Sequence, residues 1–181
     1  MKNKPSFWSA IPRALLLGLV SLPALASSSE LTLRAEATAT WLFIDVYKAA
    51  LYAPEKVGSQ QLLQETTPLN LELCYLRAIS KEQFVEAASK ALPEDLSPEL
   101  KAAVQGLHQA YQNVEPNDCY QLRYEPQQGV QLSLNQQPLF QTATAGFKQL
   151  YFGVWLGPNA LSEKVRDQLL TEVDKPVSNA R

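Results

Sequence analysis

Histidine is almost absent from the sequence, which contains only His108, and cysteine occurs only as Cys74 and Cys119. Two cysteines and one histidine cannot supply the four ligands of a typical structural zinc site, so no metal site is expected. His108 has no obvious catalytic partners, and its place just off an apolar helical stripe predicts a partly exposed residue. Glycine occurs seven times and never as G-x-G, so neither a phosphate-binding loop nor a cofactor is predicted.

Clusters of basic residues are also missing. The formal net charge is −2, from 16 basic and 18 acidic residues. Three of the basic residues, Lys2, Lys4 and Arg13, lie in the N-terminal segment, so the rest of the chain is more acidic than the whole. Nucleic acid and an anionic membrane surface are therefore not the expected partners.

The N-terminal segment has the three parts of a secretory signal peptide. A basic start is followed by the apolar run 14–20, which Ser21 and Pro23 interrupt, and by the small-x-small sequence Ala24-Leu25-Ala26. The run is too short for a membrane span, which needs about 20 apolar residues. We predict cleavage between Ala26 and Ser27. No cysteine follows for a lipid anchor, so residues 27–181 are expected in the periplasm or outside the cell, with no stable membrane anchor.

Cys74 and Cys119 both lie in strand-like segments. An even cysteine count in an exported protein favours a disulfide, because the compartment is oxidising. Such a bridge would contribute roughly 3–4 kcal/mol by restricting the unfolded chain. Two separate buried thiols acting as small apolar side chains remain the alternative.

Alternating and helical periodicities divide the remaining sequence into strands and helices. Ser80 and Gln83 form a capping box before one helix, and Ser97-Pro98 is typical of the start of a second. Strands are predicted at 31–34, in 39–53 as one long or two consecutive strands, and at 69–79, 119–124, 130–134 and 139–141; helices are predicted at 81–91, from 98, from 147 and after Ser162. This order predicts an α+β domain over residues 27–172, with helices on one face of an antiparallel sheet, and a flexible tail at 173–181.

Three charged residues lie in the predicted strands. Asp45, between Ile44 and Val46, is expected to face outward in an alternating strand. Arg77 and Arg123 could pair with a carboxylate of the protein or of a ligand, or lie on the solvated face of the sheet.

Four stretches resemble the exported bacterial branch of the chalcone isomerase-like family. They are Val46-Tyr47-Lys-Ala-Ala-Leu-Tyr52, Leu71-x-Leu-x-Tyr-x-Arg-x-Ile79, Asp118-x-Tyr-x-Leu-x-Tyr-x-Pro-x-x-Gly-Val130, and Phe152-Gly-Val-Trp-Leu-Gly157 with the segment after it. The likeness covers about residues 31–170. It implies the open-faced β-sandwich of that family, in which a large antiparallel sheet and a helical layer enclose an elongated apolar cleft.

The catalytic residues of the plant isomerases do not transfer to this sequence. The positions that match their arginine are Ala39 and Thr40, and Leu42 matches their threonine. Lys148 falls where a second hydroxyl residue is expected, and their tyrosine and asparagine have no clear counterpart. No residue is therefore named as catalytic, since loss of one oxyanion donor alone typically lowers a rate by about 10²–10³.

The resemblance implies a non-catalytic protein that binds a small apolar ligand in the cleft. Tyr47, Tyr75, Arg77 and Trp155 are the candidates to line it. The carboxylate-binding arginine of the fatty-acid-binding relatives is missing from its usual place, so the ligand need not be a fatty acid.

Two alternatives remain, an isomerase or lyase that uses other residues and an envelope protein with a filled core. A cavity of about 300 Å³ or more would favour binding. An arginine, Arg34, Arg77 or Arg123, pointing into an empty cleft beside hydroxyl groups would overturn the expectation of an inert scaffold.

Overall fold

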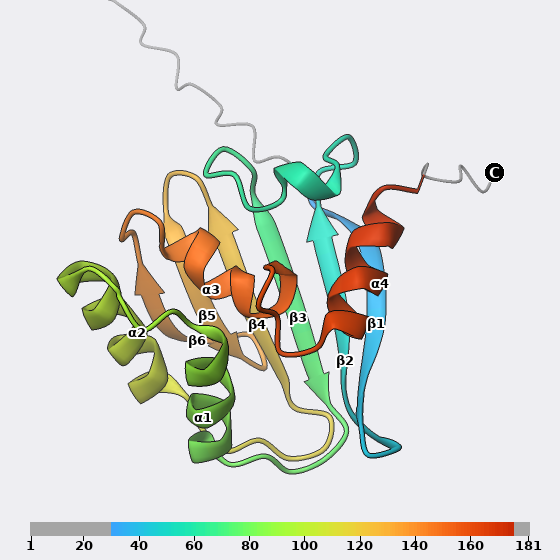
Figure 1. The fold of residues 1–181 in the computed structure, drawn as a ribbon, viewed down its shortest axis with the longest axis vertical. Helices are drawn as coiled ribbons and strands as arrows, with labels where there is room; N and C mark the ends of the chain where they lie inside the picture. Colours follow the sequence, from blue (N-terminus) through green and yellow to red (C-terminus); the bar gives the residue numbers. More distant parts are fainter. Residues whose placement is uncertain (1–29, 176–181) are drawn as a thin grey trace, which may run out of the picture.

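Residues 30–175, which the computed structural model describes, form a six-stranded antiparallel sheet and four α-helices (Figure 1). The strands follow chain order across the sheet. They are β1 (Thr32–Trp41), β2 (Ile44–Ala53), β3 (Leu69–Tyr75), β4 (Cys119–Glu125), β5 (Gly129–Leu134) and β6 (Gln137–Thr142). The helices are α1 (Lys81–Ala91), α2 (Pro98–Ala110), α3 (Phe147–Leu156) and α4 (Glu163–Val173), and a short 3-10 helix, η1 (Ser59–Gln61), precedes β3. The predicted α+β fold is confirmed.

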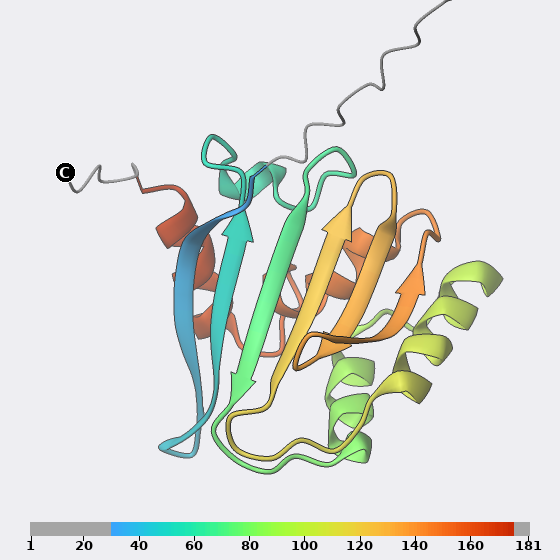
Figure 2. The ribbon, with the colours of Figure 1, turned by 180° about the vertical axis from the view of Figure 1, so that it is seen from behind.

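The helices cover one face of the sheet, and Figure 2 shows the other face without a helical layer. In β3 every second residue is buried, so Leu69, Leu71, Leu73 and Tyr75 face the helices. The residues between them face the uncovered side, as expected for a strand whose side chains alternate. α3 packs over the middle of the sheet, α4 packs on β1, and α2 lies beside β6 at the opposite edge. The apolar core therefore lies in one layer between sheet and helices.

β1 and β2 form a hairpin whose turn the sequence did not locate. β1 runs without a break through residues 35–38, and the chain reverses direction at Leu42 and Phe43. Both residues have positive φ angles, 46° and 67°, which are normally found in glycine or asparagine. The predicted strand at 31–34 is thus part of the longer β1, and the break expected before residue 39 was wrong. Of the two alternatives for 39–53 the structure has two strands, but no turn-forming residue marks the reversal between them.

β3 ends earlier than predicted. Its last residue is Tyr75, and Arg77 lies in the loop that follows rather than in a strand. Ile79 forms only an isolated bridge with Val114. This loop leads directly into α1, where Ser80 accepts a hydrogen bond from the Gln83 backbone as the capping box predicts. The loop places Arg77 at one end of the sheet.

Cys74 and Cys119 form a disulfide. They are directly opposite each other on β3 and β4, on the face of the sheet that the helices leave uncovered. The structure therefore decides between the two alternatives in favour of the bridge. It joins the two strands next to Tyr75, the last residue of β3.

Arg34 ties the end of α4 to the sheet. Its guanidinium donates hydrogen bonds to the backbone oxygens of Pro54 and Val173, both at 2.7 Å, and of Val57 at 3.1 Å. Val173 is fully buried, and Asp174 accepts hydrogen bonds from Ser59. The predicted tail therefore begins too early, because its first two residues belong to the folded domain. Residues 176–181, like the predicted cleavage site at Ala26–Ser27, lie outside the described residues.

Within the described part of the chain, no helix has the length and apolar character that crossing a bilayer would need. The longest, α2, has 13 residues, whereas a span needs about 20.

Candidate functional site

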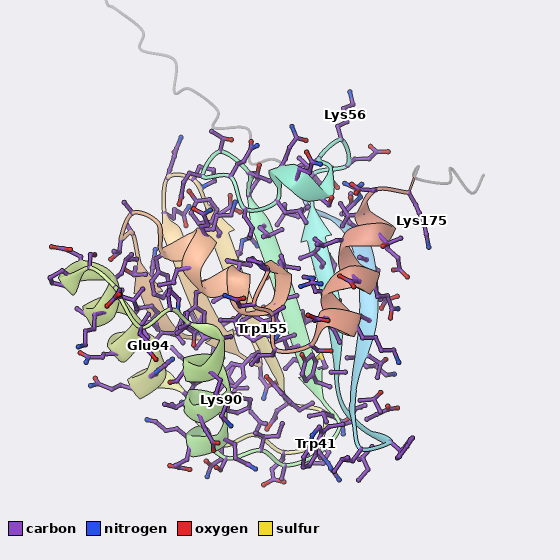
Figure 3. The ribbon with its side chains drawn as sticks, viewed as in Figure 1. Trp41, Lys56, Lys90, Glu94, Trp155 and Lys175 are labelled. Atoms are coloured by element: carbon purple, nitrogen blue, oxygen red, sulfur yellow. A yellow bond between two sulfur atoms is a disulfide. The ribbon has the colours of Figure 1, made fainter. Side chains whose placement is uncertain are left out.

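A cavity of about 930 Å³ lies between the sheet and the helical layer and is partly open to solvent. Its walls come from the last residues of β1, the first of β2, the loop after β3, helix α1, helix α3 and the α3–α4 loop. Most of its lining is apolar. Figure 3 shows Trp155 near the middle of the molecule and Trp41, which also lines the cavity, at the end of the β1–β2 hairpin. The cavity thus runs from the centre of the helical layer to the hairpin end of the sheet.

The four residues selected from the sequence, Tyr47, Tyr75, Arg77 and Trp155, all line this cavity. Tyr75 and Trp155 are buried, Tyr47 is half-buried, and Arg77 is exposed. Tyr47 and Tyr75 are paired across β2 and β3, while Trp155 reaches the same space from α3. Their contact with a ligand remains a prediction.

Aromatic rings form the floor of the cavity. The ring of Tyr75 lies 5.9 Å from that of Tyr47 and 5.1 Å from that of Phe84, both edge to face. Phe84 in turn stacks on Tyr111 at 5.2 Å. Such contacts fix large, stiff side chains in one arrangement. The floor is therefore an apolar surface whose shape does not depend on flexible side chains.

The tyrosine hydroxyls on this floor stay protonated at physiological pH. Burial raises the pKa of Tyr47 to about 12, against a smaller lowering by the Trp155 side chain. Burial, together with the neighbouring Tyr111, raises the pKa of Tyr75 well above its usual value. Within residues 30–175 the Tyr75 hydroxyl has no hydrogen-bond partner. It can therefore donate a hydrogen bond to a ligand or to water, but it cannot act as a base.

Arg77 provides an uncommitted positive charge at the edge of the cavity. No carboxylate of the described chain lies within 4.0 Å of its guanidinium. The other cation of the rim, Lys90, pairs with Glu86 at 2.7 Å. A ligand with an anionic group could therefore pair with Arg77 without displacing an existing partner.

The two other arginines considered from the sequence are engaged elsewhere. Arg34 holds the backbone at the end of α4, and Arg123 pairs with Glu125 at 2.7 Å. Of these three arginines only Arg77 bears on the condition that would favour catalysis, since it lines the cavity together with Thr40 and the tyrosines. Arg77 meets this condition only in part. The guanidinium is exposed to water, where it would stabilise an oxyanion far less than in a dry site.

The positions that match the plant catalytic residues supply no comparable groups. Ala39 and Thr40 line the cavity, and the Thr40 hydroxyl donates to Asp45 at 2.8 Å. Asp45 is exposed, as expected for an outward-facing strand residue. Leu42 is exposed at the hairpin end and is not part of the lining.

Lys148 is buried away from the cavity. Its ammonium donates to the backbone oxygens of Gln64 and, at 2.6 Å, Thr67, and it lies 4.5 Å from the centre of the Tyr124 ring. Burial lowers its pKa to about 8, opposed by the charge of Glu65. These contacts indicate a structural role in holding the loop before β3.

Sequence analysis missed the residues that α1 and the α3–α4 segment contribute. These include Phe84, Ala87, Ala88, Val154, Leu161 and Ser162. A signal was present in the alanines at 87, 88 and 91, which follow Phe84 on the inner stripe of α1. Small side chains opposite an aromatic sheet leave space unfilled.

His108 is half-buried, with its ring beside those of Tyr111 and Tyr151 at 6.2 and 6.1 Å. Its Nε2 is buried without a partner in the described chain, and burial lowers the pKa of His108, so the neutral form is favoured.

No group of three or more His, Cys, Asp or Glu side chains within residues 30–175 could hold a metal ion.

Comparisons with known proteins agree with this architecture. Over residues 21–171 the sequence matches the family model described as chalcone isomerase-like. The fold is similar to the crystal structure of a fatty-acid binding protein of Arabidopsis thaliana, with a TM-score of 0.62 and 12% sequence identity over 84% of this chain and 92% of that chain. No curated protein sequence matches the chain. Because the family model spans most of its length, the chain belongs to the chalcone isomerase-like family.

Proposed function

We propose that this protein binds a small apolar ligand, such as a lipid or a fatty-acid-like molecule, in the cavity and does not catalyse a reaction. The observation that carries the proposal is the cavity itself, about 930 Å³ and mostly apolar in lining. Ligand sites typically measure about 300–1,000 Å³. A structural protein with a filled core would leave no such space between its sheet and helices.

The similar fold of the Arabidopsis fatty-acid binding protein supports an apolar ligand. Arg77 supports a ligand that also carries a negative group, because an acyl chain lying on the aromatic floor would leave its head at the open rim where Arg77 is unpaired. The neutral hydroxyl of Tyr75, on the cavity floor, can donate a hydrogen bond to the ligand. The ligand class that fits these features is a long apolar chain with one anionic head.

We also propose that the protein acts outside the cytoplasm. The basic start, the short apolar run and the Ala24-Leu25-Ala26 sequence support cleavage after Ala26 and export to the periplasm or the medium. The Cys74–Cys119 bridge independently supports a place outside the cytoplasm, because structural disulfides persist in oxidising compartments. The same leader sequence supports membership of an exported branch of the family.

An isomerase or lyase is the second candidate, and the presence of Arg77 in the same cavity lining as Thr40 and Tyr75 is what favours it. Incubation with a chalcone tests it. We expect no turnover above background, and turnover that Arg77→Gln abolishes would establish the enzyme instead.

A titration with a fluorescent fatty acid tests the binding proposal. Ala87→Trp places a large indole in the cavity wall, whereas Ala102→Trp makes the same change on an exposed site of α2 outside the lining. We expect saturable binding to the wild type and to Ala102→Trp, and at least about a tenfold loss in Ala87→Trp. Equal binding to all three proteins would place the ligand elsewhere.

A second pair of variants tests the anionic head. Arg77→Gln should weaken a fatty acid about tenfold, because it removes one charge-assisted hydrogen bond. It should leave the fatty alcohol of the same length unaffected. Arg123→Gln, on the uncovered face of the sheet, is the matched control and should change neither ligand. A fatty acid and its alcohol that respond alike to Arg77→Gln would exclude a role in charge recognition.

A further inference from the structure

The end of the β1–β2 hairpin exposes four consecutive large apolar side chains. Trp41, Leu42, Phe43 and Ile44, here named the hairpin tip, are 67%, 68%, 102% and 45% exposed. Such side chains are usually buried, and a contiguous exposed patch marks an interaction surface more often than a single exposed residue does. The tip therefore needs an explanation that folding alone does not supply.

The backbone of the tip adds to this argument. Leu42 and Phe43 adopt positive φ angles, at which bulky residues are strained and for which Asn-Gly is the usual sequence. Neither side chain is buried, so packing within the described chain does not offset that strain. Strained backbone positions are concentrated at functional sites.

The hairpin tip is continuous with the open side of the cavity. Trp41 belongs both to the tip and to the cavity lining. Leu76, which is also exposed, lies next to Val46, two residues from the tip, because its backbone N–H donates to the Val46 oxygen at 2.9 Å. The next residue is Arg77, the unpaired cation of the rim. Figures 1 and 3 show the hairpin end and Trp41 at the same end of the sheet as the β3–α1 loop.

We propose that the hairpin tip inserts reversibly into the surface of a lipid bilayer and brings the mouth of the cavity against it, so that a lipid-like ligand passes between membrane and cavity. This inference rests on the proposed function. Tryptophan favours the bilayer interface, and insertion would bury Leu42 and Phe43 among the acyl chains.

A bilayer fits the tip better than a protein partner does. The four side chains project from a two-residue turn and offer on the order of 600 Å², below the roughly 800 Å² per partner of a stable protein interface. The surface is also convex, since it is the end of a hairpin. Because the sequence has no basic cluster, insertion depends on apolar contact rather than on anionic lipids. Binding to uncharged phosphatidylcholine is therefore expected.

Replacing the tip by the usual turn sequence separates function from folding. Leu42→Asn with Phe43→Gly removes two apolar side chains and relieves the positive φ angles, so the double variant should be at least as stable as the wild type. Leu33→Thr, which removes a similarly exposed leucine from the opposite end of β1, is the control. All proteins are purified in the same way from the exporting host, so residues outside the described range contribute equally.

Cosedimentation with phosphatidylcholine vesicles is the measurement. We expect the wild type and Leu33→Thr to bind, and Leu42→Asn/Phe43→Gly to bind about a hundredfold more weakly, about tenfold for each side chain. Added directly in solution, a fluorescent fatty acid should bind all three equally. Loaded into the vesicles, it should reach the double variant more slowly.

The outcomes are distinguishable. Vesicle binding that is absent in the wild type or unchanged in the double variant would overturn the proposal. A wild type that forms dimers, without vesicle binding, and becomes monomeric in the double variant would overturn it in favour of a contact between two copies. Vesicle binding without any uptake of fatty acid from solution would contradict the proposed function. It would also contradict the transfer of ligand between membrane and cavity, whereas membrane contact by the tip would stand.

Discussion

Removing the Cys74–Cys119 bridge should destabilise the domain by about 4 kcal/mol. The bridge spans a sequence separation of 45 residues, and the loss of loop-closure entropy in an unfolded chain cross-linked over that length gives about this value. Domains of this size are typically stable by about 5–15 kcal/mol, so the loss would be a large share of the total. The two residues already face each other on β3 and β4, so the folded strands need not rearrange when the bridge is removed.

Urea unfolding of the wild type and of the Cys74→Ala/Cys119→Ala variant, followed by circular dichroism, measures this loss. The denaturant dependence should become steeper in the variant, because its unfolded chain is no longer cross-linked and exposes more surface. Fatty-acid binding should not change, since the bridge lies on the face of the sheet away from the cavity. A loss below about 1 kcal/mol would refute the entropic reasoning.

Two further predictions concern stability. The pKa of each of the seven tyrosines is raised, mainly by burial, and reaches about 12 in Tyr47 and Tyr124. The unfolded chain loses these protons near pH 10 while the folded protein keeps them, so the free energy of unfolding should fall as the pH rises above 10. Tyrosinate absorbance and unfolding should then increase over the same pH range. Ionisation of most tyrosines at a lower pH than unfolding would contradict this. Arg34→Met should lower the free energy of unfolding by about 2 kcal/mol in urea denaturation, because it leaves three backbone oxygens without their donor. Arg123→Met, which breaks an exposed ion pair, should change it by less than about 0.5 kcal/mol, and equal effects of the two would count against the role of Arg34.

Helix starts and the order of strands and helices along the chain followed from the sequence because their determinants are local. Ser80 with Gln83, and Ser97 with Pro98, satisfy the first backbone donors of α1 and α2, and the structure has both helices at the expected residues. The alternation in β3 likewise identified Tyr75 as an inward residue. Periodicity and capping are properties of a few neighbouring residues, so a single sequence can reveal them.

The hairpin turn did not follow from the sequence, and the cavity was expected only from the family resemblance, without its size. Nothing in Leu42-Phe43 indicates a reversal, since the residues that favour positive φ are absent there. The size of the cavity depends on how far α1 stands from the sheet, and Phe84 of α1 packs on Tyr75 and Tyr120 of strands distant in sequence. Arg77 was selected correctly as a lining candidate but placed in the wrong kind of element, because the end of β3 carries no breaker residue.

Native mass spectrometry of the protein, purified from cells without detergent or added ligand, tests the central claim most directly. The account predicts that the wild type and Ala102→Trp carry a co-purifying lipid-like molecule, bound non-covalently in a one-to-one complex. Ala87→Trp should carry none. A wild type that is always free of ligand, and that takes up no fatty acid on incubation, would contradict the claim that the cavity between sheet and helices is a binding site.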